Sequence, residues 1–306
     1  MKYKIGSFNC LNYNGLNKKP DTYCKIIKKE QFDIVALQEI KRKEAIDQML
    51  KLLGPDWTGE FDSDFRANDY AFLWNTKRFH LTSAETASGI RENRPRIYKQ
   101  YKIDRSNLQT NLVREPYFAR FTPSGLIGGG WFEIRILNAH VRFSKGKNSD
   151  EMLLPGEIAM RQNEVDVLSK TIYAKEADKI YGNNMPAYTI LLGDYNLNKK
   201  DSDANSPYIR DEVIEIIDGD RMKRIVTLQS SLTTLSKASE DGSTENKKML
   251  SNNYDHVTFD EIRYRGIESS VYVIDAVTKY CGGDYAKYKK EVSDHLPICI
   301  TFNLKK

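Results

Sequence analysis

SDHLPICITF, residues 293–302, joins a polar start directly to a run in which apolar residues alternate. The apolar side chains at 298, 300 and 302 would face one way and those at 299 and 301 the other, which is the two-residue period of a half-buried strand. An acid and an imidazole, Asp294 and His295, come just before this strand. We therefore predict that they lie at the rim of a sheet, where other strands ending in polar groups would meet them.

The composition is that of a folded globular protein with a substantial core. Hydrophobic residues make up 40% of the 306 residues and charged residues 29%, which excludes a disordered chain. The formal net charge of +5 is too small to identify a polyanionic partner by itself. We predict a single domain over residues 1–306, with surface insertions near 91–112 and 232–253.

The cysteines and the N-terminal sequence favour an intracellular protein. The four cysteines are scattered without the close pairs of a zinc site, and a chain of this size does not depend on disulfides. Strand-like sequence begins almost at Met1, so no secretory signal is expected. No stretch approaches the run of about 18 apolar residues that spans a membrane. We expect a cytoplasmic protein without a membrane span.

Hydrophobic periodicity predicts strands and helices along the whole chain. Strands are predicted at 2–9, 32–39, 69–75, 116–122, 131–141 and 187–196, and helices at 22–30, 46–53 and 165–172. A short helix is predicted within 206–218 from the spacing of Val213, Ile214 and Ile217. Residues 232–253 are rich in Ser, Thr, Asn and Lys and are predicted to form a long surface loop.

Polar side chains suited to catalysis or metal binding follow the apolar runs of several strands. They are Asn9, Glu39, His140, Asp194 with Asn196, Asp255 with His256, and Asp294 with His295. Three of the four histidines belong to this set, although a single histidine is more often structural than catalytic. In the Gly-Asp-Tyr-Asn stretch at 193–196, the glycine lets the backbone come close, and an Asx turn is the alternative to a catalytic role.

The oxygen ligands among these residues indicate a hard cation. Glu39, Asp294 and the amide of Asn9 suit Mg²⁺ or Mn²⁺, whereas the scattered cysteines and the separation of the histidines disfavour zinc. A hard dication surrounded by hydrogen-bond donors offsets the charge that develops during phosphodiester cleavage. Asp194 and Asn196 would place a carboxylate and an amide beside the attacking water.

Seven motifs resemble, in their order along the chain, the endonuclease/exonuclease/phosphatase superfamily, and most of all its deoxyribonuclease I-like branch. They are SFNCLN (7–12), DIVALQEI (33–40), VREPYFARF (113–121), LNAHV (137–141), LLGDYNL (191–197), NYDHV (253–257) and SDHLPI (293–298). Together they span nearly the whole chain. The resemblance implies an α/β fold, a four-layer sandwich in which two packed mixed β-sheets are flanked by helices.

The resemblance also implies how the metal and the water would be held. Glu39 would be the principal metal ligand, with Asn9 and Asp294 near the same ion. Asp194 and Asn196 would orient or activate the attacking water, and Asn196 would also contact the substrate.

The remaining implied roles belong to the two imidazoles and an arginine. His295, held in its tautomer by Asp255, would be the base or a phosphate contact, and the choice of base between His295 and Asp194 stays open. His140 would protonate the leaving group or stabilise the pentacoordinate phosphate. Arg114 would contact the phosphate, although an exposed ion pair with the next residue is the alternative.

The sequence departs from the family pattern around two of these positions. Deoxyribonuclease I places a carboxylate, the partner of the His140-type imidazole, where this chain has Asn68 with Asp69 next to it, so a shifted partner or none is expected. Lys41 stands where an arginine enters the minor groove of DNA, and it would contact substrate without the planar fork. Residues 91–120 contain eight Lys/Arg against three acids, interleaved with aromatics, which fits either a nucleic-acid surface or a solvated insertion.

We therefore predict an Mg²⁺-dependent phosphodiesterase whose partner is nucleic acid, with a DNA endonuclease of low sequence specificity as the favoured activity. One alternative is a phosphodiesterase or phosphatase for a small phosphoester, such as an inositol phosphate or a lipid headgroup. The missing Trp-Cys-Asp-Arg motif of inositol phosphatases disfavours it. The other alternative is a nucleic-acid-binding module that has lost catalysis, which the nearly complete set of expected side chains disfavours.

Overall fold

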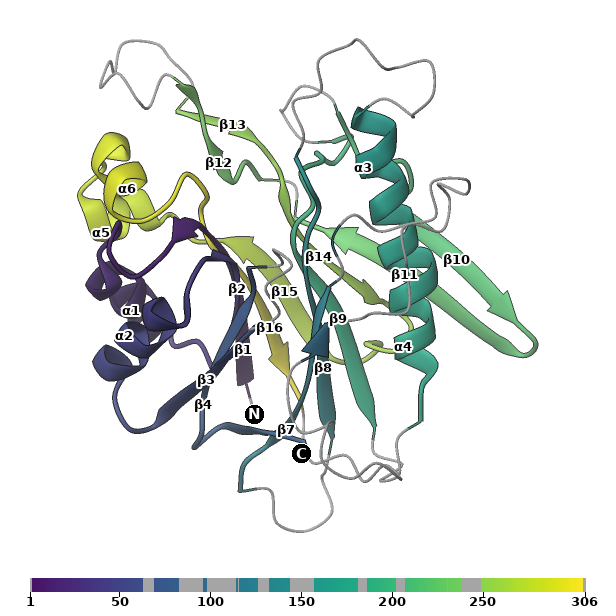
Figure 1. The fold of residues 1–306 in the computed structure, drawn as a ribbon. Coiled ribbons are helices and arrows are strands. Elements are labelled where there is room, and N and C mark those ends of the chain that lie inside the picture. Colours follow the sequence, from purple (N-terminus) through teal and green to yellow (C-terminus); the bar gives the residue numbers. More distant parts are fainter. Residues whose placement is uncertain are drawn as a thin grey trace.

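Two β-sheets packed face to face form the centre of the molecule (Figure 1). The computed structural model describes residues 2–62, 69–82, 96–97, 114, 116–125, 132–143, 157–180, 186–201, 207–229, 231–237 and 249–304. The six-stranded sheet has the order β15 (Glu268–Val273), β16 (Ile298–Asn303), β1 (Lys2–Tyr13), β2 (Ile34–Ile40), β4 (Ala71–Asn75) and β3 (Trp57–Phe61). It is mixed, because β1 and β2 are parallel whereas β1 and β16 are antiparallel.

The eight-stranded sheet is also mixed. Its order is β10 (Val213–Asp218), β11 (Arg221–Leu228), β14 (Asp255–Asp260), β9 (Ala187–Asp194), β8 (Glu133–His140), β7 (Tyr117–Pro123) and β5 (Phe79–Leu81), with β6 (Arg96–Ile97) beside β7. Only the pair β8 and β9 runs parallel among its described neighbours.

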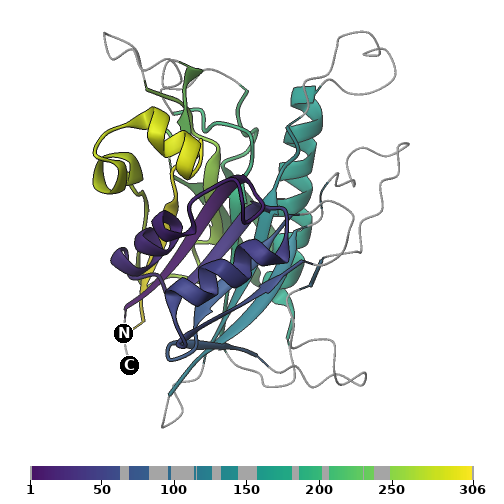
Figure 2. The ribbon, with the colours of Figure 1, turned by 60° about the vertical axis from the view of Figure 1, so that its left-hand side comes forward.

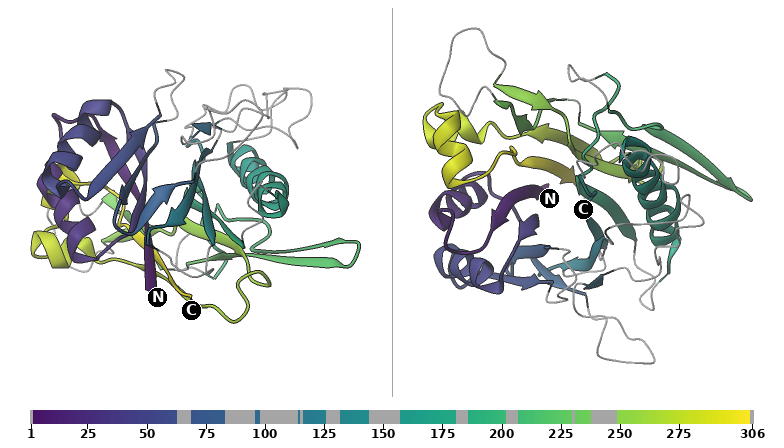
Figure 3. Two further views of the ribbon diagram at one scale, coloured as in Figure 1. Left: turned by 90° about the horizontal axis from the view of Figure 1, so that it is seen from below. Right: turned by 45° about the horizontal axis from the view of Figure 1, so that its top comes forward.

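Helices cover the outer face of each sheet and complete four layers (Figures 2 and 3). On the six-stranded sheet these are α1 (Pro20–Lys29), α2 (Lys43–Leu53), α5 (Ala276–Cys281) and α6 (Tyr285–Glu291). On the eight-stranded sheet a continuous helical run consists of α3 (Glu157–Asp166), the π-helical segment η2 (Val167–Tyr173) and α4 (Ala174–Asp178). The four-layer sandwich predicted from the sequence is confirmed.

Strand β1 shows how alternation builds two separate cores. Tyr3 and Ile5 point into the apolar core between the sheets, whereas Phe8 and Cys10 belong to the core under α1, α2, α5 and α6. Ser7 and Asn9 share the inter-sheet face with Tyr3 and are buried at 1% exposure, so polar groups replace apolar ones toward one end of the strand. The alternation that the sequence displays therefore places Asn9 between the sheets.

The segment predicted as a short helix within 206–218 is a strand, so that prediction is wrong. Val213–Asp218 forms β10, the edge strand, and pairs antiparallel with β11 from Val213 opposite Val226 to Asp218 opposite Arg221. The apolar residues of Val-Ile-Glu-Ile-Ile fit a helical spacing over one turn, but pairing with β11 decides the conformation.

The ends of the predicted surface loop at 232–253 are also strands. Thr234–Leu235 (β12) pairs with Leu250–Asn252 (β13). The first of these two strands is held to the segment before β16, because Leu235 N–H donates to Asp294 O and Leu296 N–H donates to Thr233 O. The part of the predicted loop at 238–248 lies outside the described residues, as does most of the predicted insertion at 91–112.

The ends of the chain mark one end of the sandwich and the polar strand tips mark the other. β1 begins at Lys2 opposite Asn303 of β16, and its later residues approach the start of that strand. The site residues on β1, β2, β8 and β9 therefore lie at the end far from the termini (Figure 1). No helix in the described part of the chain has the length and apolar character needed to cross a membrane.

Candidate active site

The carboxylate of Asp194 is the point at which the strand tips of both sheets meet. Its Oδ2 accepts a hydrogen bond from Asn9 Nδ2 at 3.0 Å. It also lies 3.6 Å from His140 Nε2 and 3.7 Å from His295 Nε2. Glu39 Oε1 completes the group at 3.2 Å from Asn9 Nδ2 and 3.7 Å from His140 Nε2. Five of the side chains predicted from the sequence are thus brought together.

Strand register in the eight-stranded sheet places Asp194 between two other site residues. His140 is its parallel partner on β8, and Asp255 is its antiparallel partner on β14. Gly193 permits this approach, since its φ is +138° and a Cβ there would stand 1.9 Å from Ala139 O. The close backbone approach expected of this glycine is therefore present.

Glu39 is held at the tip of β2 in an unusual backbone conformation. Its φ is +58°, in the left-handed region that non-glycine residues seldom occupy. Oε1 accepts from Asn9 Nδ2, and Oε2 accepts from the backbone N–H of Asn12 at 2.9 Å. Backbone strain of this kind is typical of functional sites, where the surroundings hold a side chain in position.

The position of Asn9 separates two acids. Its Nδ2 donates to both Glu39 and Asp194, and its Oδ1 accepts from the backbone N–H of Leu11 at 3.0 Å. The amide hydrogens therefore face the carboxylates, while the amide oxygen, which a metal ion would need, faces the backbone. In this arrangement Asn9 stabilises two neighbouring negative charges.

The surroundings of His140 favour its neutral form and define its tautomer. Arg114 Nη1 contacts His140 Nδ1, and because a guanidinium only donates, Nδ1 accepts and the ring proton is on Nε2. Burial, together with Arg114, holds the pKa of His140 well below its usual range. Nε2 lies 3.7 Å from Glu39 Oε1 and 3.6 Å from Asp194 Oδ2, too far for a hydrogen bond to either, so its N–H group is available to donate to a substrate.

His295 has the opposite protonation state. Burial alone would lower the pKa of its imidazole, but Asp255 and Asp194 outweigh burial and raise the pKa well above its usual range. His295 Nδ1 lies 2.8 Å from Asp255 Oδ2, which fixes the ring, and both side chains are buried. The expected pairing of His295 with Asp255 is present in the structure.

Burial also affects Asp194. It raises the pKa of this carboxyl, and the nearby His295 cation opposes the shift only in part. Oδ1 accepts from the backbone N–H of Asn196 at 2.9 Å, so the two residues form the Asx turn that the sequence allows. A carboxylate with a raised pKa beside a cation is suited to accept a proton from water.

Asn196 is fixed by the same turn, and its φ is +50°. Its Nδ2 donates to Val141 O at 2.7 Å, and its backbone carbonyl accepts from the buried Arg161 at 2.7 Å. The amide nitrogen is therefore used for structure rather than directed at a water molecule. His256 is buried in the core, where its Nε2–H donates to Leu197 O at 2.7 Å, which is a structural contact.

Within the described residues, the side chains of Lys41 and Asp294 form no hydrogen bond or ion pair with the group around Asp194. Lys41 forms an ion pair with Asp69, so the acid that the sequence offered as a shifted partner for His140 binds Lys41 instead. Asp294 lies beside the group, and its Oδ1 is buried without a hydrogen-bond partner in the described part of the chain. Asn68 lies outside the described residues.

The two carboxylates near the site fit an Mg²⁺ ion that is bound by few protein ligands. Glu39 offers a carboxylate and Asp294 an orphaned carboxylate oxygen, both hard ligands of the kind that Mg²⁺ prefers. No group of three His, Cys, Asp or Glu side chains in the described residues is arranged to hold a metal. Mg²⁺ tolerates such a site, because it commonly keeps several waters and binds through one or two carboxylates.

Three residues that support the site were not predicted. Tyr70 OH accepts from His140 N–H at 2.8 Å, and Ser293 Oγ donates to Asn9 O at 2.6 Å. Glu164 Oε1 accepts from the backbone N–H of Arg114 at 2.8 Å. Ser293 stands next to a predicted metal ligand and so had a sequence signal, whereas Tyr70 and Glu164 resemble ordinary strand and helix residues.

Comparisons with known proteins agree with this architecture. A TDP2 from D. rerio, complexed with a single-strand DNA product, matches with a TM-score of 0.58 and 17% identity over 99% of both chains. An endonuclease/exonuclease/phosphatase family protein from Bacteroides thetaiotaomicron matches with a TM-score of 0.53 and 13% identity, over 100% of this chain and 99% of its own.

A mannosyl-6-phosphatase from the same bacterium matches with a TM-score of 0.52 and 12% identity, over 99% of this chain and 100% of its own. No family model and no curated protein sequence matches the chain. At these identities the likeness concerns the fold. The chain has the deoxyribonuclease I-like fold of the endonuclease/exonuclease/phosphatase proteins.

Proposed function

We propose that this protein hydrolyses phosphoester bonds, and that its substrate is a phosphodiester in DNA. The observation that supports this is the meeting of two carboxylates and two differently protonated imidazoles around one point, Asp194 Oδ2. Such a group combines a proton acceptor, a neutral donor and a cation within one short radius. Hydrolysis of a phosphate ester requires each of these.

The directions of the pKa shifts support the following roles in this proposal. Asp194 takes the proton from the attacking water, since its pKa is raised and His295 already holds its own proton. The cationic His295 contacts the phosphate oxygens, and Asp255 positions it. His140 donates its Nε2–H to the developing charge and does not protonate the leaving group, because its pKa is lowered. Arg114 sets the His140 tautomer and adds positive charge beside it.

Mg²⁺ is the proposed cofactor, with Mn²⁺ as a substitute. Glu39 would hold it as the principal ligand and Asp294 would be the second, while Asn9 keeps Glu39 apart from Asp194. When bound, the ion supplies a positive charge that polarises the phosphate. The backbone N–H of Asn12 donates to Glu39 Oε2 and so fixes the position of this carboxylate.

DNA is the proposed substrate on two grounds. The TDP2 neighbour is complexed with single-strand DNA, and the sequence carries a basic, aromatic-rich segment at 91–120. A low-specificity endonuclease would contact the phosphate backbone rather than base edges. A small phosphoester is the second candidate, since a mannosyl-6-phosphatase shares the fold.

Purified protein should be incubated with supercoiled plasmid, linear duplex, single-stranded DNA, inositol phosphates and a sugar 6-phosphate, each with Mg²⁺ and with EDTA. We expect nicking of plasmid in Mg²⁺ only. Glu39→Ala and His295→Ala should each lower turnover by more than about a thousandfold. Glu44→Ala and His80→Ala, on the exposed faces of α2 and β5, are the matched controls.

Each other outcome has a definite meaning. Release of phosphate from the sugar or inositol phosphates without nicking would replace DNA by a small phosphoester. DNA binding in EDTA with no hydrolysis of any substrate in Mg²⁺ would replace the enzyme by a binding module. Near-normal turnover in both active-site variants would refute the proposed site.

A further inference from the structure

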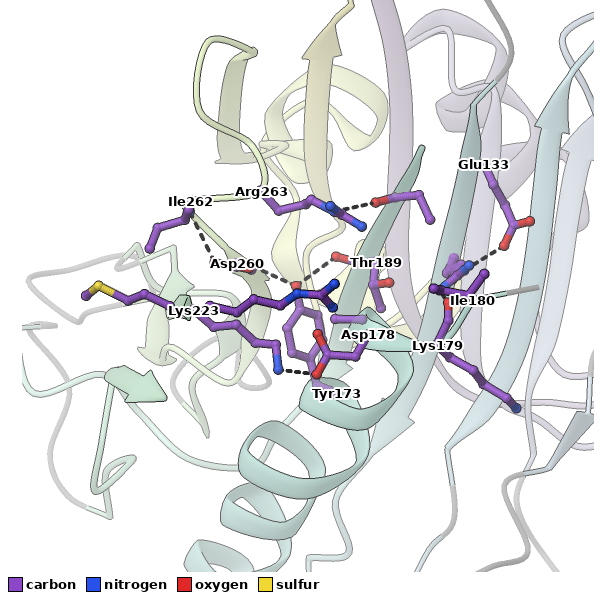
Figure 4. A pocket seen from close by; sticks show the side chains of 15 residues that line it. Glu133, Tyr173, Asp178, Lys179, Ile180, Thr189, Lys223, Asp260, Ile262 and Arg263 are labelled. Atoms are coloured by element: carbon purple, nitrogen blue, oxygen red, sulfur yellow. Dashed lines mark hydrogen bonds and ion pairs between the residues drawn. The ribbon is translucent and has the colours of Figure 1, made fainter. Parts of the chain in front are cut away.

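A cavity lies at the opposite end of the eight-stranded sheet from the candidate active site. Its volume is about 600 Å³, within the range of small-molecule sites. Its walls come from the start of β8 and β9, from η2 and α4, from β11 and from the turn after β14 (Figure 4). Thr189 on its wall precedes Asp194 by five residues of one strand, which places the two sites roughly 17 Å apart.

The acidic side chains of this cavity are already paired. Glu133 accepts from two buried arginines, Arg120 and Arg135, at 2.6–2.8 Å. Asp178 forms an ion pair with Lys223, as Figure 4 shows. Asp260 Oδ1 accepts from the backbone N–H groups of residues 224 and 262 at 3.1 Å. The negative charges on the wall are therefore neutralised or satisfied from within the protein.

Two arginines on the rim have no acidic partner in the described part of the chain. Neither Arg221 nor Arg263 forms an ion pair within the described ranges. Arg263 Nε donates to Ala187 O at 3.2 Å, which holds the guanidinium against the cavity wall and leaves its terminal nitrogens for another acceptor. A guanidinium presents a planar fork of donors that matches the oxygens of a phosphate.

A buried hydroxyl inside the cavity also lacks a partner. Thr189 is 2% exposed, and its Oγ1 makes no hydrogen bond to any of the described residues. Its carbonyl, by contrast, accepts from the hydroxyls of Tyr173 and Tyr264 at 3.1 and 3.2 Å. A buried hydroxyl without a partner is destabilising, so a bound polar group that reaches it would recover that energy. Thr189 is thus a second, independent feature that fits a ligand.

Part of the remaining wall is apolar. Ala177 and Ile180 from the end of the helical run and Met222 from β11 line it, and the last two are well exposed. We propose that this cavity binds a compact organic phosphate, with the phosphate at Arg221 and Arg263, a polar group of the ligand at Thr189 and its apolar part against Ile180 and Met222. Inorganic phosphate would engage the arginines alone and bind more weakly.

Isothermal titration calorimetry in EDTA tests the proposal, with adenosine monophosphate and inorganic phosphate as separate probes. We expect the nucleotide to bind with 1:1 stoichiometry and the inorganic anion at least tenfold more weakly. Thr189→Val keeps the shape and removes the hydroxyl, and Arg263→Gln removes the charge. Each should weaken nucleotide binding about tenfold, while His295→Ala, which changes only the candidate active site, should bind as the wild type does.

The control variants distinguish a failure of this binding proposal from a failure of the proposed function. Thr189→Val should unfold at the same temperature as the wild type or higher, since it removes an unsatisfied group, so weaker binding is not a folding defect. Absence of heat with wild-type protein would overturn the proposal. So would binding lost in His295→Ala and retained in Arg263→Gln, and equal affinity for both probes would overturn the organic part.

Discussion

Replacing Asp255 by asparagine tests the arrangement that keeps His295 protonated. Asp255 Oδ2 lies 2.8 Å from His295 Nδ1, and both side chains are buried. The substitution keeps the volume and the strand pairing with Asp194 but removes the charge that, with Asp194, raises the pKa of His295. Asp255 acts through His295 and is therefore a positioning residue.

The expected loss of activity follows from one charged hydrogen bond. Such a bond contributes about 1.5–3 kcal/mol. If His295 needs its proton and its orientation in the transition state, kcat/KM should fall by about 10- to 150-fold, since about 1.4 kcal/mol corresponds to a factor of ten. The fall should be in kcat, because the ring is oriented before the substrate arrives.

The effect on stability depends on pH with a defined sign. The folded pKa of His295 lies above its unfolded value, so the pair stabilises the protein fully below about pH 6.5 and less as the pH rises through the folded pKa. Asp255→Asn removes this contribution. Its loss of unfolding free energy relative to the wild type should therefore be larger at pH 6 than at pH 9, with an upper limit of about 3–5 kcal/mol.

Urea denaturation at both pH values and hydrolysis of bis(p-nitrophenyl) phosphate at pH 7 measure the two effects. Asp260→Asn is the matched control, because Asp260 is the last residue of the same strand, is also buried and lies at the far end of the sheet. The reasoning is refuted if Asp255→Asn retains activity within twofold and loses equal stability at pH 6 and pH 9. A comparable activity loss in Asp260→Asn would refute the local explanation.

Three further predictions concern the scaffold. Glu133→Gln should lower the unfolding free energy in urea by about 3–5 kcal/mol, because two buried arginines lose their counter-charge, and a change below about 1 kcal/mol contradicts this. Gly193→Ala should fail to fold or should melt far below the wild type, since its Cβ would stand 1.9 Å from Ala139 O. Gly125→Ala is the control: its Cβ would meet no atom of the described non-neighbouring residues within 4 Å, so it should fold with a modest loss of unfolding free energy from its positive φ. Burial lowers the pKa of His256, so below about pH 6.5 the unfolded chain binds a proton that the folded chain does not. The unfolding free energy measured in urea should therefore fall more between pH 7.5 and pH 5.5 in the wild type than in His256→Gln.

The spacing of apolar residues along the chain explains which strands and helices were predicted and which were missed. The alternation at 298–302 gives β16, and the apolar run at 34–37 lies inside β2. The same reasoning failed at 213–218, where one helical turn and a strand have the same apolar spacing and only pairing with β11 distinguishes them. The short helices α5 and α6 were missed, since six or seven residues give too little periodicity.

The candidate site shows the same division. The sequence identified Asp194, His140 and His295 as polar groups at strand tips, and the structure brings both imidazoles within 4 Å of the Asp194 carboxylate. It did not reveal that the partner of His140 is Arg114 rather than a carboxylate, or that Asp69 binds Lys41. These contacts depend on where loops and strand ends lie after the sheets have packed.

The amino-acid sequence by itself determined where most of the predicted strands and helices form and which chemical types stand at the strand tips, because the two-residue and 3.6-residue periods are properties of the local backbone. The layered sandwich was implied by the resemblance of seven motifs to a known superfamily. Tertiary structure alone decided which strand tips meet and which imidazole is favoured in its cationic form. Asn9 and Asp194 are 185 residues apart in the chain yet share a hydrogen bond. The pKa values of His140 and His295 move in opposite directions because one is buried beside a guanidinium and the other between two carboxylates.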